Sequence, residues 1–262
     1  MPSAGVGSGM TLFLQWMVAV SYLLAAGILL AHNRWPQMQR VAIGLVSAGL
    51  LLHIAMVLVR GVNSGQVPIM TRYEDFTVDA LSMVSVWLLA QWRWPQLRQS
   101  GVLLLPLAAF IVVAALSYSR GVFPMSPALR TNWLVIHASL NSLAVGFGAV
   151  TLAVGLVLKS DRMDLVGRFM SWTFLLWCGM VAAGSYWASI AWGRFWGWDP
   201  IECWSLGTIF IYAFVLHLRM KPRWREGCWS ALVGVLPFGL MMFTTYGLVF
   251  VMRSVHGQYV FQ

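Results

Sequence analysis

The chain has 262 residues, of which 60% are hydrophobic and only 10% are charged. About a quarter of the residues of a soluble domain are charged, so this composition excludes a soluble globular protein and indicates an integral membrane protein. The net charge of +9 does not indicate nucleic-acid binding, because the basic residues lie in short segments between apolar runs. Three scattered cysteines form no CxxC pair and no metal-ligand spacing, so we interpret them as structural thiols.

Apolar runs long enough to cross a lipid bilayer as helices recur along the whole chain. They predict an all-α polytopic membrane protein with about eight transmembrane helices. We expect a single domain over residues 1–262, because no linker or soluble insert interrupts the runs. The first run follows an uncharged segment, so we interpret it as a retained span and not a cleaved signal. The predicted spans lie near residues 11–31, 41–60, 75–94, 101–118, 132–158, 167–190, 201–220 and 231–251.

The basic residues are distributed unequally between the two sets of connections. Eleven lie in or beside the connections after the first, third, fifth and seventh spans, and six lie on the other side. By the positive-inside rule the first set faces the cytoplasm, which places both termini on the periplasmic side. The connection from Arg219 to Arg225 contributes most to this assignment. The longer connections, 61–74 and 119–131, are then expected on the outer face, where loops can build a site.

Five tryptophans lie between Trp187 and Trp204. The second half of this region predicts a helix start, with Asp199 as the N-cap, Pro200 at the first helical position and Glu202 as the capping-box carboxylate. The first half has two glycines among large aromatic side chains, which predicts an irregular segment with flat apolar faces. We name residues 192–204 the tryptophan loop. Its surface suits a planar apolar ligand, and the alternative is an interfacial aromatic loop followed by an ordinary helix cap.

Two histidines are predicted at the same outer face as the tryptophan loop. We expect Asn132 to cap span five, which puts His137 about 7–8 Å below the outer end of that span, and His256 follows span eight. Two imidazoles beside an aromatic surface suit axial ligation of a haem iron, whereas a single interfacial histidine is more often a polar anchor. Arg194 and Arg253 flank this region, where they can pair with haem propionates or face lipid headgroups.

Two further histidines, His53 and His217, lie within apolar runs. Such a residue is a functional candidate, and the alternative is a neutral histidine bonded to a neighbouring backbone or hydroxyl group. We expect His53 about 18 Å and His217 about 5 Å from the inner ends of their spans, so straight helices do not bring them to one iron. Asp79, one turn after Asp75, is predicted to favour the N-terminus of span three and not to relay protons.

These residues occur in an order that resembles a known family. The tryptophan-rich WWD signature of haem-handling proteins in cytochrome c maturation is similar to the stretch Trp192-Gly-x-x-Trp196-x-Trp198-Asp199-Pro200-x-Glu202-x-Trp204. More closely, the chain from about His53 to His256 resembles the CcsA (ResC) component of the system II cytochrome c synthase. The other matching elements are His53 with Arg60, Gly65, Pro68, Tyr73 and Glu74, then Trp133-Leu-x-x-His137, Leu216-His217-x-Arg219 and His256-Gly257.

The resemblance implies a haem lyase component that holds haem at two places. A membrane site would use His53 and His217 as ligands of the haem iron, and an external site over the tryptophan loop would use His137 and His256. Haem b would be presented at the outer face of a bacterial inner membrane, or its equivalent, for thioether attachment to the CxxCH motif of apocytochrome c. A ResB/CcsB-type membrane protein would be the partner. The catalytic candidates are His137, His256 and Asp199, and the further expected haem contacts are Trp192, Trp196, Trp198, Trp204, Asp199, Glu202, Arg194 and Arg253.

The chain departs from the family pattern at several positions. Ser189 and Ile190 replace an Asn-Glu pair, Ile201 stands where lysine is common, and Thr71 stands where asparagine usually precedes Arg-Tyr-Glu. These changes bear on substrate contacts and partner identity more than on haem binding. One alternative is a CcmC-like protein of about six spans, without the transmembrane histidine pair, that passes haem to a chaperone without ligation. The other is a haem-free membrane transport or structural protein.

Overall fold

The computed structural model of the chain describes residues 6–31, 37–69, 71–122, 129–157, 163–225 and 228–254. Within these ranges every regular element is a helix and there is no strand. The chain forms two compact units, Met1–Val122 (unit 1) and Phe123–Gln262 (unit 2). The predicted all-α fold is confirmed.

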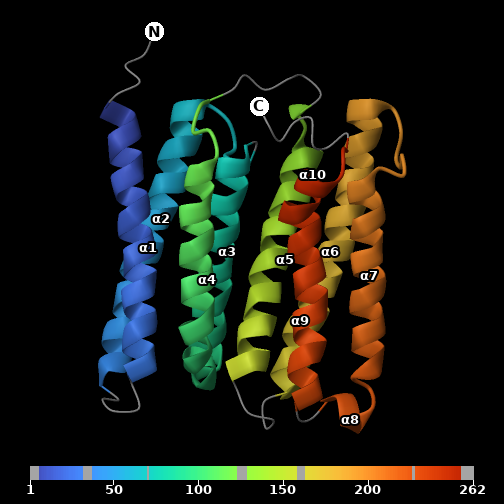
Figure 1. Cartoon of the computed structure of the whole chain (residues 1–262). Coiled ribbons are helices and arrows are strands. Elements are labelled where there is room, and N and C mark those ends of the chain that lie inside the picture. The colour runs from blue at the N-terminus through green and yellow to red at the C-terminus, as the bar shows by residue number, and fades with distance from the viewer. Residues whose placement is uncertain are drawn as a thin grey trace. The chain divides into compact units, whose positions relative to one another are not determined.

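Unit 1 is an antiparallel bundle of long helices (Figure 1). They are α1 (Val6–Ala31), α2 (Met38–Ser64), α3 (Arg72–Arg93) and α4 (Gly101–Ala114), with the 3-10 segments η1 (Pro95–Ser100) before α4 and η2 (Ala115–Ser117) after it. Helix α1 packs against α2 and α4, and α3 packs against α4 and α2. This arrangement puts the middle of α2 next to α1, where the central histidine of the unit lies.

Local signals explain where the helices of unit 1 begin and end. Gly65, at φ 64°, ends α2 in the left-handed conformation that glycine adopts at little cost. Thr71 and Glu74 form a capping box at the start of α3, so the threonine at this position serves as the capping side chain. Pro95 ends α3, because the residue before a proline disfavours helical backbone. The predicted helix-start role of Asp79 is wrong, because this residue is buried two turns inside α3.

Unit 2 contains the second set of long helices. They are α5 (Asn132–Val157), α6 (Met163–Trp192) and α7 (Pro200–Leu218), followed by the short α8 (Pro222–Arg225) and by α9 (Cys228–Met242), the π-helix η5 (Phe243–Gly247) and α10 (Leu248–Val251). Helix α5 packs against α6 and α9, and α7 packs against the same two helices. The last three elements continue one another as a single rod (Figure 1), and its η5 segment contacts the first half of α7.

Most of these helices are long and apolar enough to cross a membrane. Seven candidate spans lie among the described residues, and their ends agree with the predicted spans to within six residues. Helix α3, with 22 residues, is about 33 Å long and also reaches across a hydrocarbon core. Charged side chains near both of its ends make it less apolar than the other seven. The chain is therefore a multi-pass membrane protein, and α3 as an eighth span stays a prediction.

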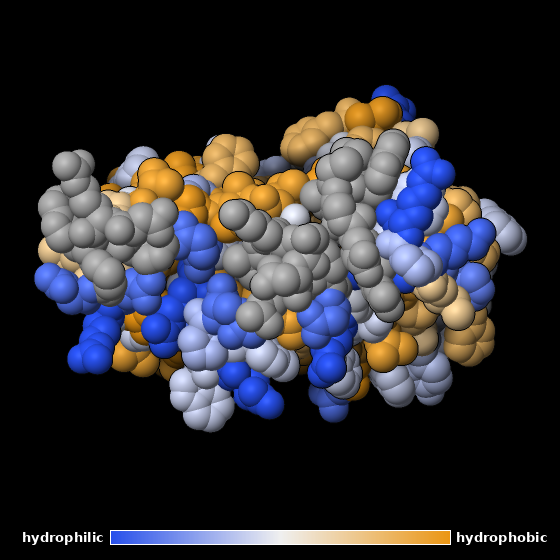
Figure 2. Space-filling view, turned by 90° about the horizontal axis from the view of Figure 1, so that it is seen from below, coloured by the Kyte–Doolittle hydropathy of each residue, from blue (hydrophilic) through white to orange (hydrophobic). Residues whose placement is uncertain are grey.

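The surface of the helices agrees with a lipid environment. Large apolar side chains are exposed on the sides of the bundles, for example Val62, Phe110 and Leu236. Figure 2 shows hydrophilic residues among apolar ones on the face seen from below. By the positive-inside rule, the sequence predicts the cytoplasmic excess of basic residues in the connections after α1, α3, α5 and α7. The orientation of the termini follows from this rule alone and stays a prediction.

Candidate functional site

The tryptophan loop leaves α6 at Trp192 and enters α7 at Pro200, and the residues between them are not helical, as predicted. Gly193 has φ 72°, which turns the chain away from α6. Trp198 has φ 56°, a conformation that costs about 1–3 kcal/mol for a bulky residue. Its indole is nevertheless 72% exposed. A strained backbone that displays a large apolar side chain indicates a functional position.

The carboxylate of Glu202 holds the backbone on both sides of Trp198. Its Oε2 accepts the N–H of Gly197 at 2.7 Å and the N–H of Asp199 at 3.1 Å. Asp199 in turn accepts the N–H of Ile201 at 3.0 Å, which completes the predicted capping box. Hydrogen bonds to a charged acceptor are stronger than neutral ones, so they offset part of the strain at Trp198. Asp199 is buried, and both carboxylates therefore shape the loop from within.

The aromatic surface of the loop is built from rings that meet edge to face. Trp196 and Trp198 lie with their ring centroids 6.1 Å apart and their planes at 88°. Trp204 meets Phe243 of η5 at 5.1 Å and 69°. The guanidinium group of Arg194 lies against Gly197, where a Cβ atom would be 2.5 Å from its Cζ. A cationic group thus lies beside the backbone that carries the two indoles, as a site for an apolar ligand with carboxylates requires.

His137 on α5 is connected to the tryptophan loop through α6. Its Nδ1 lies 2.9 Å from the carbonyl oxygen of Met180, and because a carbonyl only accepts, the proton is on Nδ1. The neutral ring then carries its lone pair on Nε2. The imidazole lies nearly parallel to Trp187, at 6.1 Å and 19°, and Trp187 meets Trp192 at 4.8 Å. A Cβ atom at Gly184 would lie 2.6 Å from His137 Nδ1, so a glycine makes room for this hydrogen bond.

The other predicted members of the external site lie near the same end of unit 2 or beyond the described residues. Thr131 caps α5, because its side-chain oxygen accepts a hydrogen bond from the backbone N–H of Leu134 at 3.2 Å. The prediction that Asn132 is the cap is therefore wrong by one residue. The depth expected for His137 hardly changes. Arg253 follows α10 and is exposed. His256 lies outside the described residues, so the external histidine pair stays a prediction.

In unit 1, His53 lies in the middle of α2 and is fully buried. The hydroxyl of Tyr22 on α1 lies 3.1 Å from its Nδ1. Its Nε2 is also buried, and the backbone of Thr77 on α3 interacts with the ring. The imidazole thus has polar neighbours on α1 and α3, and its role as a metal ligand stays a prediction.

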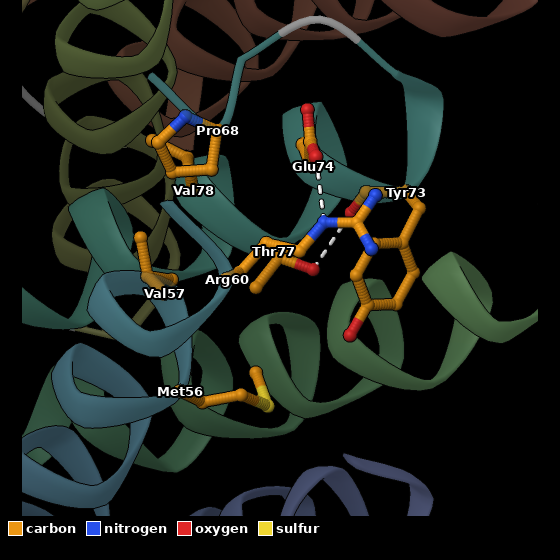
Figure 3. A pocket seen from close by; sticks show the side chains of 8 residues that line it. All are labelled: Met56, Val57, Arg60, Pro68, Tyr73, Glu74, Thr77 and Val78. Carbon is orange, nitrogen blue, oxygen red and sulfur yellow. Dashed lines mark hydrogen bonds and ion pairs between the residues drawn. The ribbon is translucent and has the colours of Figure 1, made fainter. Parts of the chain in front are cut away.

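Two turns further along α2, a polar cluster surrounds Arg60 (Figure 3). Arg60 Nε donates to Glu74 at 2.7 Å, and its terminal nitrogens donate to the carbonyl oxygens of Arg120 and Gly121, also at 2.7 Å. Figure 3 shows the guanidinium group beside the ring of Tyr73, with its Cζ 5.6 Å from the ring centroid. These contacts join α2, α3 and the segment after η2 around a small pocket. They account structurally for Arg60, Tyr73 and Glu74, which the resemblance singles out.

His217 lies one residue before the end of α7 and is exposed. Its neighbour Arg219 is buried and lies against Gly167 of α6, where a Cβ atom would be 3.4 Å from Nη2. His53, by contrast, lies about 16 Å from the C-terminal end of its helix. Because His53 belongs to unit 1 and His217 to unit 2, their binding to one iron stays a prediction.

The comparison with protein families decides the identity of the chain. The family described as "Cytochrome C assembly protein" matches residues 72–256. The chain belongs to this family. The relative named "Cytochrome c biogenesis protein CcsA" from Synechococcus sp. (strain RCC307) is 30% identical, over 75% of this chain and 78% of its own length. A relative named "Cytochrome c biogenesis protein CcsA" from Synechococcus sp. (strain JA-3-3Ab) is 24% identical, over 92% of this chain and 94% of its own length. Protein NrfI from Wolinella succinogenes is 27% identical, over 78% of this chain and 24% of its own length.

Within this cytochrome c assembly protein, the family match has a definite extent. It begins at Arg72, the first residue of α3, and includes the tryptophan loop, His137 and His217. Helices α1 and α2 precede it, so Tyr22 and His53 lie outside the family match. The match therefore supports the site in unit 2 more directly than the buried histidine in unit 1.

Sequence analysis missed three features of this cytochrome c assembly protein. They are Tyr22, which bonds to the α2 histidine, Gly184, which makes room for the α5 histidine, and Phe243 in η5, which contacts Trp204. Each feature joins residues more than 30 positions apart, so local patterns carry little information about it. The only local signal is weak: a tyrosine within an apolar run needs a hydrogen-bond partner, without indicating which one.

Proposed function

We propose that this cytochrome c assembly protein is the haem-handling subunit of a cytochrome c synthase. It presents haem b at the periplasmic face of a bacterial inner membrane for thioether attachment to apocytochrome c. Membership of the family and the CcsA names of its relatives support this role. The observation that carries the proposal is His137, whose hydrogen bond to Met180 puts the lone pair on Nε2 and whose ring lies against Trp187, which contacts Trp192 of the tryptophan loop.

The residues of unit 2 are suited to holding an iron porphyrin. A neutral imidazole whose other nitrogen donates to a carbonyl is the form in which histidine binds metals. The indoles of Trp196 and Trp198 offer apolar surface to the macrocycle, and Arg194 offers a guanidinium group to its propionates. In the proposed site His256 is the second ligand. Glu202 and Asp199 act on the backbone of the loop and keep its indoles in place.

The attachment reaction itself needs little from the protein beyond position. Each thiol of the CxxCH motif adds across one vinyl group, so that a carbon–sulfur bond forms and the thiol proton goes to the other vinyl carbon. No electrons are gained or lost in this addition, and no leaving group departs. The chemistry belongs to the haem and the thiols, and the subunit contributes by holding one reactant in a fixed orientation.

The membrane part of the proposal concerns His53 and His217 and a ResB/CcsB-type partner subunit. The position of His53 in the middle of a membrane-spanning helix supports a haem site within the membrane, because an ionisable residue inside a span is a functional candidate. It also favours the synthase over the CcmC-like alternative, which lacks transmembrane histidines. The long helices favour the same choice, because α3 as an eighth span would bring the seven candidate spans to the number expected for the synthase subunit.

The proposal is tested by replacing His137 with alanine. We expect covalent haem on a reporter cytochrome c, co-expressed with a ResB/CcsB-type partner, to fall at least tenfold, because second-shell and ligand losses at metal sites have effects of about 10–100-fold or more. The matched control is Ser139→Ala, an exposed position on the same helix. Normal maturation in His137→Ala, with normal protein levels, would contradict the assignment.

A second measurement addresses haem handling independently of attachment. The protein purified from haem-replete cells should show a Soret band, and omission of the partner should abolish attachment while leaving some haem bound. Colourless protein with normal helical content would point instead to the haem-free alternative.

A further inference from the structure

The rod formed by α9, η5 and α10 contains an irregular turn beside α7. Leu248 donates its backbone N–H to the carbonyl oxygen of Phe243, five residues back, so η5 is a π-helical turn and not an α-helical one. Such turns are rare within α-helices, where they occur frequently at functional sites. η5 contacts the first half of α7, the helix that the tryptophan loop enters. A rare helical turn therefore lies against the helix that follows the loop.

The sequence of η5 accounts for this wide turn. The hydroxyl groups of Thr244 and Thr245 donate to the backbone carbonyl oxygens four residues before them, at 2.9 and 3.0 Å. In a membrane-spanning helix, hydroxyl groups of this kind satisfy carbonyl groups that an irregular turn frees. Gly247 ends the turn, and a Cβ atom there would lie 2.7 Å from Cδ2 of the Phe243 ring. The threonines and the glycine thus permit the turn and leave room for the phenylalanine ring.

The Phe243 ring lies against the first half of α7. It meets Trp204 with the ring centroids 5.1 Å apart and the planes at 69°, an edge-to-face geometry that aromatic pairs prefer. Beside this pair, the buried hydroxyl oxygens of Thr244 and Thr208 lie 3.2 Å apart. Thr208 also donates to the backbone carbonyl oxygen of Trp204 at 2.8 Å. η5 therefore contacts Trp204 at its ring and, through Thr208, at its backbone.

The two residues before Trp204 hold the strained part of the tryptophan loop. Glu202 accepts the backbone N–H groups on both sides of Trp198, at 2.7 and 3.1 Å. The Cys203 thiol donates to the carbonyl oxygen of Trp198 at 3.5 Å. Because residues 202–204 lie within one turn of α7, a displacement of Trp204 also displaces the carboxylate and the thiol. The position of the exposed Trp198 indole therefore depends on what supports Trp204.

We infer that Phe243 is a positioning residue for the tryptophan loop, and that the π-helical turn places its ring against Trp204. This inference rests on the proposed function, because the loop is the proposed haem surface. One extra residue in a turn rotates the side chains before it by about 100° relative to those after it. The rotation lets Phe243 and Thr244 contact α7 while Leu248 stays buried. Phe243 acts through Trp204 and does not touch the ligand.

The first test follows the loop in haem-free protein, so it does not depend on activity. Cys203 is free and exposed, and its thiol contacts the loop backbone, so its reactivity reports the loop conformation. The background is the full chain in detergent with Cys178→Ser and Cys228→Ser, which leaves one thiol. The probe is N-ethylmaleimide, and the rate of labelling is followed by mass spectrometry.

In this background, Phe243→Leu should raise the labelling rate at least threefold, because Trp204 loses the ring that supports it. The matched control is Phe147→Leu, which removes a half-buried phenylalanine ring of α5 that contacts Phe169 and lies outside the loop. The control should label at the parent rate. An unchanged rate in Phe243→Leu, or an equal rise in both variants, would overturn the positioning role.

A second set of variants separates positioning from a general loss of stability. The methyl group of Gly247→Ala displaces the Phe243 ring, so this variant should label fast and unfold at a lower temperature. Adding Phe243→Leu relieves the clash, so the unfolding midpoint should recover while labelling stays fast. Labelling that returns to the parent rate with the midpoint would show that it follows stability alone, and would overturn the inference. Gly239→Ala is the control in α9, because a Cβ atom there meets nothing within 4 Å.

A hemin titration connects this inference to the proposed function. A His53→Ala background removes the proposed membrane site, so that the Soret change reports the external site. Phe243→Leu should raise the Kd for hemin about tenfold, at the lower end of the effects of indirect contacts on metal affinity. If the parent binds no hemin, the proposed function fails, whatever the labelling rates show. If the parent binds hemin and Phe243→Leu binds it equally tightly, only the inference about Phe243 fails.

Discussion

The two units hold their central histidines in contrasting surroundings. In unit 2, His137 is partly exposed, lies nearly parallel to Trp187 of α6 and donates to a backbone carbonyl. In unit 1, His53 is fully buried and meets the hydroxyl of Tyr22. A carbonyl oxygen permits one tautomer of the imidazole, whereas a hydroxyl permits both. His137 is thus held in one tautomer, with its lone pair on Nε2, and His53 keeps a choice of tautomer in an enclosed site.

The contrast extends to what holds each site together. Unit 1 uses polar contacts between helices, with Arg60, Glu74 and two backbone carbonyls at 2.7 Å, and Gln15 between α1, α3 and α4. Unit 2 uses aromatic contacts around the loop and a carboxylate that binds the loop backbone. Substitutions in the two units should therefore have separable effects.

The largest effect is expected from Arg60→Met, which removes the guanidinium group that pairs with the buried carboxylate of Glu74. Removal of one partner from a buried ion pair costs about 3–5 kcal/mol, and Arg60 also releases two carbonyl oxygens. We expect a clearly lower midpoint of thermal unfolding in detergent, followed by circular dichroism. The control is Arg93→Met, whose exposed guanidinium group lies near Trp94. Equal midpoints for the two variants would contradict the structural role of the cluster.

An intermediate effect, confined to unit 2, is expected from Gly184→Ala. The added methyl group would lie 2.6 Å from His137 Nδ1 and displace the ring from Met180, at a cost of about 1–3 kcal/mol. The yield of covalent haem on a reporter cytochrome should fall about tenfold, by the conversion of 1.4 kcal/mol to a factor of ten. Gly179→Ala is the control on the same helix, because its Cβ atom would meet Leu140 at an ordinary 3.5 Å. Equal yields would show that the hydrogen bond to Met180 is dispensable.

The smallest effect is expected from Asp199→Asn, because asparagine caps a helix about as well as aspartate. Asp199→Ala should destabilise the protein by about 1 kcal/mol, and Asp199→Asn by a few tenths. Thermal unfolding measures this difference, and covalent haem yield measures the chemistry. If Asp199→Asn is stable but fails in maturation, Asp199 contributes charge to the site and is more than a cap.

The parts of the fold and site that the sequence predicts correctly depend on short-range chemistry. The apolar runs predict the spans, and Asp199, Pro200 and Glu202 predict the start of α7 through interactions within one helical turn. The same rules misplaced the cap of α5 by one residue, because Thr131 and Asn132 are both good capping residues. They failed for Asp79, because the sequence does not show that Thr71 and Glu74 already serve the N-terminus of α3.

The sequence by itself determined that this chain is a multi-pass helical membrane protein, where its helices lie, and which histidines and tryptophans merit attention. Hydropathy over about 20 residues and capping within about four are local quantities, so a linear pattern contains them. Only the tertiary structure decided which nitrogen of His137 and His53 is held, by which oxygen, and that Gly184 and Gly49 make those contacts possible. Such contacts join helices through side chains 31 or more residues apart, and packing alone determines which of many polar groups meet.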